Sequence, residues 1–143
     1  MRFDRAGIAF DYPDNWEVDV SEGAALVSVT APEGGFWTVS AHAAGGEPLQ
    51  LAEVVARQMK REYTHIDVER AGETVAGRRL EGFDFNFSYL DLTNTAEVRV
   101  VGTATVVYLV FCQAEDRDWE HLAPVFAAMK TSLVNALPPP DPG

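Results

Sequence analysis

The residue types that most often carry catalysis are few in this chain, and their spacing does not bring them together. The three histidines, His42, His65 and His121, lie 23 and 56 residues apart, so they form no H-x-x-x-H or H-E-x-x-H pattern. The single cysteine, Cys112, lies within an apolar segment, where a thiol fills space and has a raised pKa. We therefore expect a protein that is not an enzyme and that holds no metal or cofactor.

Loops that bind phosphate or calcium are also absent from the sequence. The glycine pairs at 34–35 and 45–46 belong to no G-x-x-x-x-G-K-[ST] or G-x-G-x-x-G motif, and they are typical of turns. The acidic run at 115–120 lacks the glycine and the distal glutamate of a calcium-binding EF-hand loop. Its carboxylates instead suit the start of a helix, where they face free N–H groups.

One segment, residues 80–90, alternates between aromatic and small or polar side chains. In an extended strand the aromatic side chains share one face, and they are Phe83, Phe85, Phe87 and Tyr89. We expect two amphipathic helices to cover that face. On the other face we predict a shallow polar groove that binds a partner or ligand, formed by His42 from a neighbouring strand with Asp84, Asn86 and Ser88. The alternative interpretation is a solvated sheet surface.

Charge is distributed unevenly along the chain. Twenty-two acidic and eleven basic residues give a net charge of −11, which disfavours binding to nucleic acid. A basic patch interrupts this acidic background on a predicted helix, and its members are Arg57, Lys60 and Arg61. We expect the patch to face an acidic surface, either on a partner protein or on a second copy of the chain in a homodimer.

The pattern of apolar residues predicts an α+β fold with a sheet of about six to eight antiparallel strands and two main flanking helices. The first helix is expected at 49–63, with an apolar face and a charged face. Because Pro124 interrupts the second helical segment, we expect a short turn at 117–123, capped by Asp116 or Asp118, and a main helix from Pro124 onward. The predicted strands span residues 7–12, 16–20, 25–31, 36–43, 66–75, 78–92, 95–101 and 103–113.

Length and end composition predict one domain at 1–137, followed by a proline-rich flexible tail at 138–143. A single cysteine excludes an intramolecular disulfide. The first residues carry no apolar run of 7–15 residues, so we expect a cytoplasmic protein. No run approaches the ~18 apolar residues of a membrane-spanning helix, so we expect no membrane insertion.

Two motifs, in order across residues 3–134, resemble the Mog1/PsbP-like fold family. The first is an apolar-x-Tyr-Pro-x-x-Trp pattern whose named positions are Tyr12, Pro13 and Trp16. The second is a closing helix in which Ser132 precedes the apolar Leu133. Both motifs are structural rather than catalytic. The resemblance implies an antiparallel sheet with flanking helices, in a bacterial member of unknown function.

Members of that family act as binding or accessory proteins, and the resemblance implies the same role here. The family includes a nuclear-transport factor, extrinsic subunits of photosystem II, bacterial domains of unknown role and the Eag-type chaperones of type VI secretion. The helix segment 55–59 is similar to one in the Eag-type chaperones. We expect a non-enzymatic accessory domain that binds a protein with a basic surface. The alternatives are a chaperone for the apolar helix of a secreted effector, and a small-ligand-binding domain that uses the polar sheet face.

Overall fold

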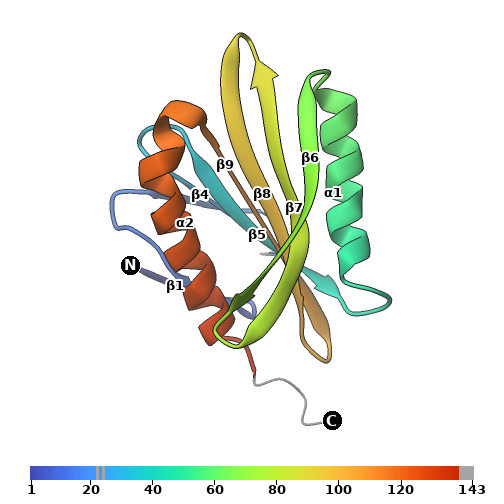
Figure 1. Cartoon of the computed structure of the whole chain (residues 1–143). Helices are drawn as coiled ribbons and strands as arrows, with labels where there is room; N and C mark the ends of the chain where they lie inside the picture. The colour runs from blue at the N-terminus through green and yellow to red at the C-terminus, as the bar shows by residue number, and fades with distance from the viewer. Residues whose placement is uncertain (22, 24, 139–143) are drawn as a thin grey trace.

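Nine strands and two helices make up the part of the chain that the computed structural model describes, namely residues 1–21, 23 and 25–138 (Figure 1). The elements are β1 (Arg2–Arg5), β2 (Ile8–Asp11), β3 (Glu17–Val20), β4 (Leu26–Thr30), β5 (Phe36–Ala43), α1 (Leu49–Glu62), β6 (Ile66–Val75), β7 (Arg78–Tyr89), β8 (Leu92–Gly102), β9 (Val106–Glu115) and α2 (Asp116–Asn135). Of the tail expected at 138–143, residues 139–143 lie outside the described residues.

The main sheet has seven strands in the order β3-β4-β5-β9-β8-β7-β6, and every neighbouring pair is antiparallel. Strands β1 and β2 form a separate antiparallel pair. The α+β class, the antiparallel sheet and the two flanking helices expected from the sequence are therefore confirmed. Strand β1 was not expected; it precedes a tight turn in which Ala6 and Gly7 have φ of 55° and 82°.

The two helices cover opposite faces of the sheet rather than the same face (Figure 1). Helix α1 packs on the face that carries Phe85 and Phe87, together with Val107 of β9. Helix α2 and the β1–β2 hairpin pack on the other face, against Val110 and Cys112 of the same strand. The expectation that both helices cover the aromatic ladder is therefore wrong. Strand β9 is apolar on both faces, so each face requires its own cover.

Helix α2 runs without a break from Asp116 to Asn135, with Pro124 inside it. The expected division at Pro124 is therefore wrong, and so is the expected cap, because the N-cap residue is Glu115 and it makes no side-chain cap bond. Pro124 lies on the exposed side of the helix. There, water can bond the carbonyl group that loses its N–H partner, which makes a proline tolerable.

The two motifs that resemble the Mog1/PsbP-like family join the N-terminal segment to helix α2. The Trp16 ring packs edge-on against Phe126, with ring centroids 5.8 Å apart. The Ser132 hydroxyl accepts a hydrogen bond of 2.8 Å from the backbone N–H of Asp11 and donates one of 2.7 Å to the carbonyl of Met129. Across the described ranges, neither helix has the length and apolar character needed to span a membrane.

Replacing Ser132 by alanine should lower the free energy of unfolding, because the Asp11 N–H then loses its acceptor. Thr131→Ala is a matched control, since the Thr131 hydroxyl bonds only within the helix, to the carbonyl of Ala127. We expect S132A to be less stable than T131A by about 1 kcal/mol in urea unfolding. Equal stability of the two variants would show that the bond between β2 and α2 contributes nothing.

Candidate functional site

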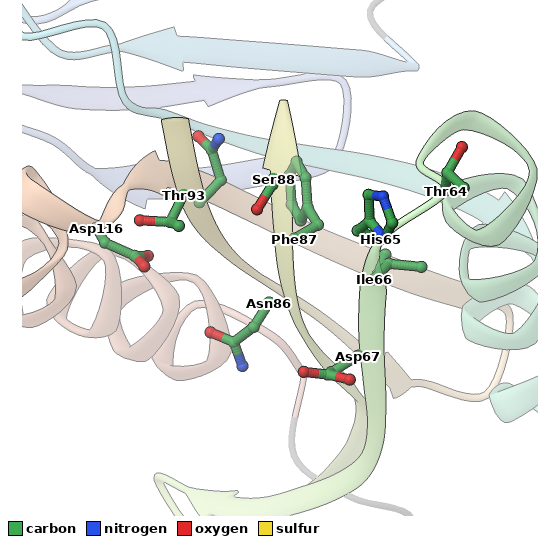
Figure 2. A pocket seen from close by; sticks show the side chains of 10 residues that line it. Thr64, His65, Ile66, Asp67, Asn86, Phe87, Ser88, Thr93 and Asp116 are labelled. Atoms are coloured by element: carbon green, nitrogen blue, oxygen red, sulfur yellow. The ribbon is translucent and has the colours of Figure 1, made fainter. Parts of the chain in front are cut away.

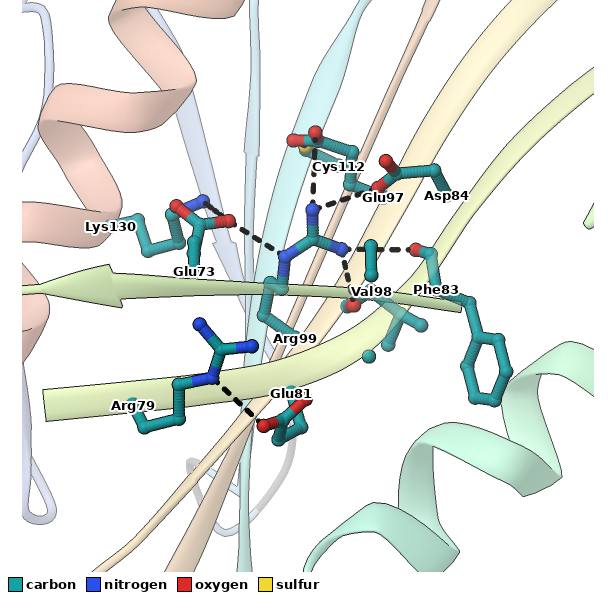
Figure 3. A network of polar contacts seen from close by, with 12 residues as sticks. Glu73, Arg79, Glu81, Phe83, Asp84, Glu97, Val98, Arg99, Cys112 and Lys130 are labelled. Carbon is teal, nitrogen blue, oxygen red and sulfur yellow. Dashed lines mark hydrogen bonds and ion pairs between the residues drawn. The ribbon is translucent and has the colours of Figure 1, made fainter. Parts of the chain in front are cut away.

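A buried arginine, Arg99 on β8, lies at the centre of a polar network on the α2 face of the sheet (Figure 3). Its side chain is 5% exposed. The Nη1 atom donates to the backbone carbonyls of Phe83 and Val98, at 3.1 and 3.0 Å. Backbone acceptors therefore hold one end of the guanidinium group, and carboxylates hold the other.

Three strands supply those carboxylates, and α2 supplies a second cation. Arg99 Nε lies 2.7 Å from Glu73 of β6, and Nη2 lies 2.8 Å from Asp84 of β7 and 3.5 Å from Glu97 of β8. Lys130 of α2 is 8% exposed, and its Nζ lies 2.8 Å from the same Glu73 oxygen. The two cations are thus neutralised by partners from β6, β7 and β8, as buried charges require.

The sequence makes room for this arginine with a glycine. Gly82 of β7 lies opposite Arg99 in the register between β7 and β8. A Cβ atom at Gly82 would overlap the carbonyl oxygen of Val98 and lie 3.1 Å from the Arg99 Cα. Only glycine therefore allows β7 to approach β8 this closely at the point where the guanidinium group turns back over the sheet.

The pKa values of Glu97 and Glu73 are shifted in opposite directions from the ordinary value. Burial raises the pKa of Glu97 above its usual range, and the nearby cations do not fully offset it. Burial also acts to raise the pKa of Glu73, but the hydrogen bonds from Lys130 and Arg99 outweigh it and lower that pKa. Burial raises the pKa of Cys112, whose Sγ lies 3.8 Å from Glu97 Oε1, so the thiol stays protonated.

A separate pocket of about 500 Å³ lies on the α2 face at one end of β6, β7 and β8 (Figure 2). Polar residues predominate in its lining, which consists of Thr64, His65, Ile66, Asp67, Asn86, Phe87, Ser88, Thr93, Asn94 and Asp116. Beside the lining, Thr95 Oγ1 lies 2.7 Å from Asp116 Oδ1 and 3.1 Å from Asn86 Oδ1. The pocket therefore offers hydroxyl, amide and carboxylate groups to whatever enters it.

The structure brings together part of the groove predicted from the sequence. Asn86 and Ser88 line the pocket, whereas Asp84, on the same face of β7, is held by Arg99 and does not line it. His42 is not part of this surface. It lies on the α1 face of β5, where its Nε2 atom is 2.9 Å from Ser40 Oγ. Two strands, β9 and β8, separate β5 from β7. Including His42 in the groove is therefore wrong, because its position along β5 has the opposite parity to Trp37 and Val39 on the α2 face.

Sequence reasoning missed several residues of the pocket, namely His65, Asp67, Thr93, Asn94 and Asp116. One signal was available for Asp67. The two-residue turn at 76–77 sets the register between β6 and β7, and this register places Asp67 directly opposite Asn86. No group of three or more His, Cys, Asp or Glu side chains within the described ranges is arranged to hold a metal ion.

The predicted basic patch lies on α1, on the other side of the sheet from the pocket. Arg57, Lys60 and Arg61 are all exposed. Lys60 and Arg61 lie in the last turn of the helix, where positive charge suits the helix dipole. Its role as a contact surface remains a prediction.

The opposite pKa shifts of Glu97 and Glu73 predict opposite effects of neutral substitutions. The folded-state pKa of Glu97 is raised, so the wild type loses stability as pH rises above the unfolded value of 4.5. Glu97→Gln should therefore stabilise the protein at neutral pH, and the gain should vanish as pH falls below 4.5.

For Glu73 the folded-state pKa is lowered, so its contribution is present above pH 4.5 and is lost as pH falls through the folded value. Glu73→Gln should therefore destabilise the protein at neutral pH, with a deficit that shrinks in acid. Urea unfolding of both variants between about pH 3 and pH 8 measures the two profiles. Shifts of the same sign at neutral pH would contradict this account of the network.

Known proteins share this architecture at low sequence identity. Neither a protein-family model nor a curated protein matches the chain. Among solved structures, cyanobacterial PsbP (CyanoP) from Synechocystis is similar, with a TM-score of 0.61, 12% identity, and coverage of 92% of this chain and 89% of that one. A Pseudomonas aeruginosa protein of unknown function, PA94, described as a putative regulator, has a TM-score of 0.59 and 16% identity, over 98% and 97% of the two chains.

A third similar structure, from Bacteroides thetaiotaomicron, has a TM-score of 0.60 and 15% identity. It covers 89% of this chain, which spans only 46% of the Bacteroides protein. Identities this low establish the fold alone. The likeness to PsbP nevertheless extends over almost the whole chain, in agreement with the two motifs that join the N-terminal segment to α2. The chain therefore has the Mog1/PsbP-like fold.

Proposed function

We propose that this chain is a non-enzymatic accessory domain that binds another protein through the tip of the β7–β8 hairpin. The observation that carries the proposal is the conformation of Leu90, which forms the tip with Asp91. Leu90 has φ of 52°, Asp91 has φ of 64°, and the Leu90 side chain is 78% exposed. In Figure 1 the hairpin extends past the ends of both helices.

A leucine in this conformation carries backbone strain. The left-handed region costs a non-glycine residue about 1–3 kcal/mol, and two-residue turns of this kind favour Asn-Gly. An exposed leucine gains little from packing within its own chain. Strained and exposed apolar residues of this kind are typical of binding surfaces, where a partner covers the side chain.

The neighbouring residues enlarge the apolar surface at the tip. Tyr89 and Leu92, which pair with each other next to the turn, are 56% and 45% exposed. Together, Tyr89, Leu90 and Leu92 form the surface that we call the hairpin tip. Because the chain carries a net charge of −11, a partner with a basic surface is favoured over an acidic one. The basic patch on α1 would then serve a second, acidic contact.

The other functions considered from the sequence receive unequal support. A chaperone for an apolar helix requires a long apolar groove, whereas polar residues predominate in the lining of the pocket at the end of β6, β7 and β8. A small-ligand-binding role is supported by the volume of about 500 Å³ of that pocket. We therefore retain ligand binding as the second candidate. Burial raises the pKa of the Cys112 thiol, which disfavours a role for this residue as a nucleophile.

The double substitution Leu90→Asn with Asp91→Gly separates folding from binding. It replaces the strained turn by residues that adopt the left-handed region readily, so we expect the free energy of unfolding to rise by about 1 kcal/mol. We expect the same variant to lose its protein partner, because the apolar side chain at the tip is gone. The measurements are urea unfolding and quantitative capture from an extract of the native cells.

Leu26→Asn is the matched control, because Leu26 is a leucine 41% exposed on β4 and the substitution removes an exposed apolar side chain elsewhere. A protein captured equally by the wild type and by L26N, and depleted about tenfold or more by the turn variant, supports the proposal. Equal capture by all three proteins would refute it.

A further inference from the structure

We propose that the free edge of strand β6 binds an extended segment of another protein, which joins the main sheet as a further antiparallel strand. The segment carries basic side chains on one face and apolar side chains on the other. This inference goes beyond the proposed function, because it assigns a second binding surface on a different strand from the hairpin tip.

Strand β6 has a row of backbone groups that face no neighbouring strand. It ends the main sheet on one side and pairs only with β7 (Figure 1). In an antiparallel pair, only alternate residues bond to the neighbouring strand. The backbone N–H of Ser88 donates to the carbonyl of His65, so the odd-numbered residues of β6 are those that bond to β7. The N–H and C=O groups of the even-numbered residues therefore point outward. These residues are Ile66, Val68, Arg70, Gly72 and Thr74.

Most features that protect an edge strand from further pairing are missing from β6. Such features are a short strand, a proline, a bulge and a basic side chain at the edge. Strand β6 has 10 residues without proline or lysine, and it pairs with β7 in one uninterrupted register. Its single arginine, Arg70, turns back over the sheet, where Nη1 donates to the carbonyl of Gly82 and Nη2 lies 2.9 Å from Glu81. The strand at the opposite edge, β3, has only 4 residues.

The two helices leave the outer edge of β6 open. On one face, the buried sheet residues beneath α1 belong to β7, β8 and β9, whereas Ile66 and Val68 of β6 are only partly buried. On the other face, α2 reaches β6 through Lys130, which bonds to Glu73 near the far end of the strand. No residue from 66 to 74 is buried. The backbone of this stretch is therefore accessible to another chain.

The side chains beside the open edge determine the chemistry of the added strand. Asp67 and Glu69 are exposed on the α2 side of β6, and Ile66 and Val68 lie on the α1 side. Residues that lie directly opposite each other in an antiparallel pair project on the same face, and opposite charges there are favourable. A strand with basic residues opposite Asp67 and Glu69 has its alternate residues opposite Ile66 and Val68, where apolar side chains fit. Basic and apolar residues must therefore alternate in the bound segment.

The same acidic residues disfavour a second copy of this chain at the edge. If β6 paired with itself about a two-fold axis at Arg70, Asp67 of each copy would lie opposite Glu73 of the other. An axis at Ala71 would place Glu69 opposite Glu73. Like charges directly opposite each other destabilise a strand pair. The acidic residues thus act against self-pairing and favour a basic segment from a different protein.

The test uses the peptide acetyl-Thr-Lys-Val-Lys-Val-Lys-Thr-amide, which has the required alternation. It is titrated into the full chain while amide hydrogen exchange is followed by NMR. We expect the outward amides of Val68, Arg70 and Gly72 to exchange rapidly in the free protein and slowly in the complex. The amides between them already bond to β7, so the peptide should change their exchange much less. Slower exchange that lies elsewhere, or none at these three positions, would overturn the proposal.

Two control peptides separate the contribution of the backbone from that of charge. In the first, both valines are N-methylated, which removes the N–H groups that would face the even-numbered residues of β6. In the second, glutamate replaces each lysine. We expect each control to bind about tenfold or more weakly than the test peptide. Equal binding by the N-methylated peptide would refute strand addition, and equal binding by the acidic peptide would refute the assignment of a basic partner.

A proline in β6 tests the edge from the side of the protein. Val68→Pro removes one outward N–H group, and an edge strand tolerates proline at a position that does not bond to its neighbour. Val18→Pro is the matched control. The N–H of Ser21 donates to the carbonyl of Leu26, so Val18 also points outward, from β3 at the opposite edge, and it is also partly buried. We expect V68P to bind the peptide about tenfold or more weakly and V18P to bind it as the wild type does. Equal binding by V68P would contradict the proposal.

A second variant keeps every backbone N–H group and changes only charge. Asp67→Asn combined with Glu69→Gln alters two exposed side chains, so it should leave the fold intact even if V68P does not fold. We expect the double variant to bind the peptide about fivefold more weakly. Glu17→Gln combined with Asp19→Asn makes the same changes on β3 and should leave the affinity unchanged. Equal affinities of the two double variants would refute the role given to Asp67 and Glu69.

Discussion

Burial of the guanidinium group of Arg99 is the constraint around which one side of this molecule is organised. A buried cation must be neutralised and its N–H groups bonded, and the acceptors come from β6, β7 and β8. Lys130 connects α2 to the same Glu73 oxygen, so the helix is fixed to the sheet by charge as well as by apolar packing. Gly82 is required because any Cβ atom there would overlap the Val98 backbone. One buried charge thus determines which residue types four elements can carry.

The same network explains why the pocket and the hairpin tip differ in character from the rest of the α2 face. Near Arg99 the charges are paired, whereas Asp67 near the start of β6 and Asp116 at the start of α2 form no ion pair with a residue that the structure describes. The strained Leu90 turn lies beyond them, at the end of the β7–β8 hairpin. The paired charges in the middle of the sheet are therefore followed, at its end, by an exposed polar pocket and by exposed apolar side chains. This gradient places the surface suited to binding on a rigid support.

The sequence predicted most elements but not how they combine. The turn at 76–77 contains a glycine and lies between the predicted strands at 66–75 and 78–92, and its two-residue length places Asp67 opposite Asn86. The turn at Leu90–Asp91 was missed because leucine rarely adopts the left-handed conformation and no glycine or asparagine marks the turn, so the predicted strand was extended to residue 92. His42 was assigned to the wrong face because strand order and parity are set by long-range pairing of β5 with β9. A break in the helix at Pro124 was predicted wrongly, because a helix tolerates a proline on the side that faces water, and the sequence alone does not show which side of α2 that is.

The buried thiol of Cys112 is a natural probe of transient local opening in this protein. Cys112 is 4% exposed on the central strand β9, and burial raises the pKa of its thiol. Reagents that react with thiolates therefore cannot modify Cys112 while α2 covers β9. Modification then requires transient opening of the sheet between α2 and β9. Since this is the only cysteine in the chain, the rate of its labelling reports the free energy of that opening without any engineered marker.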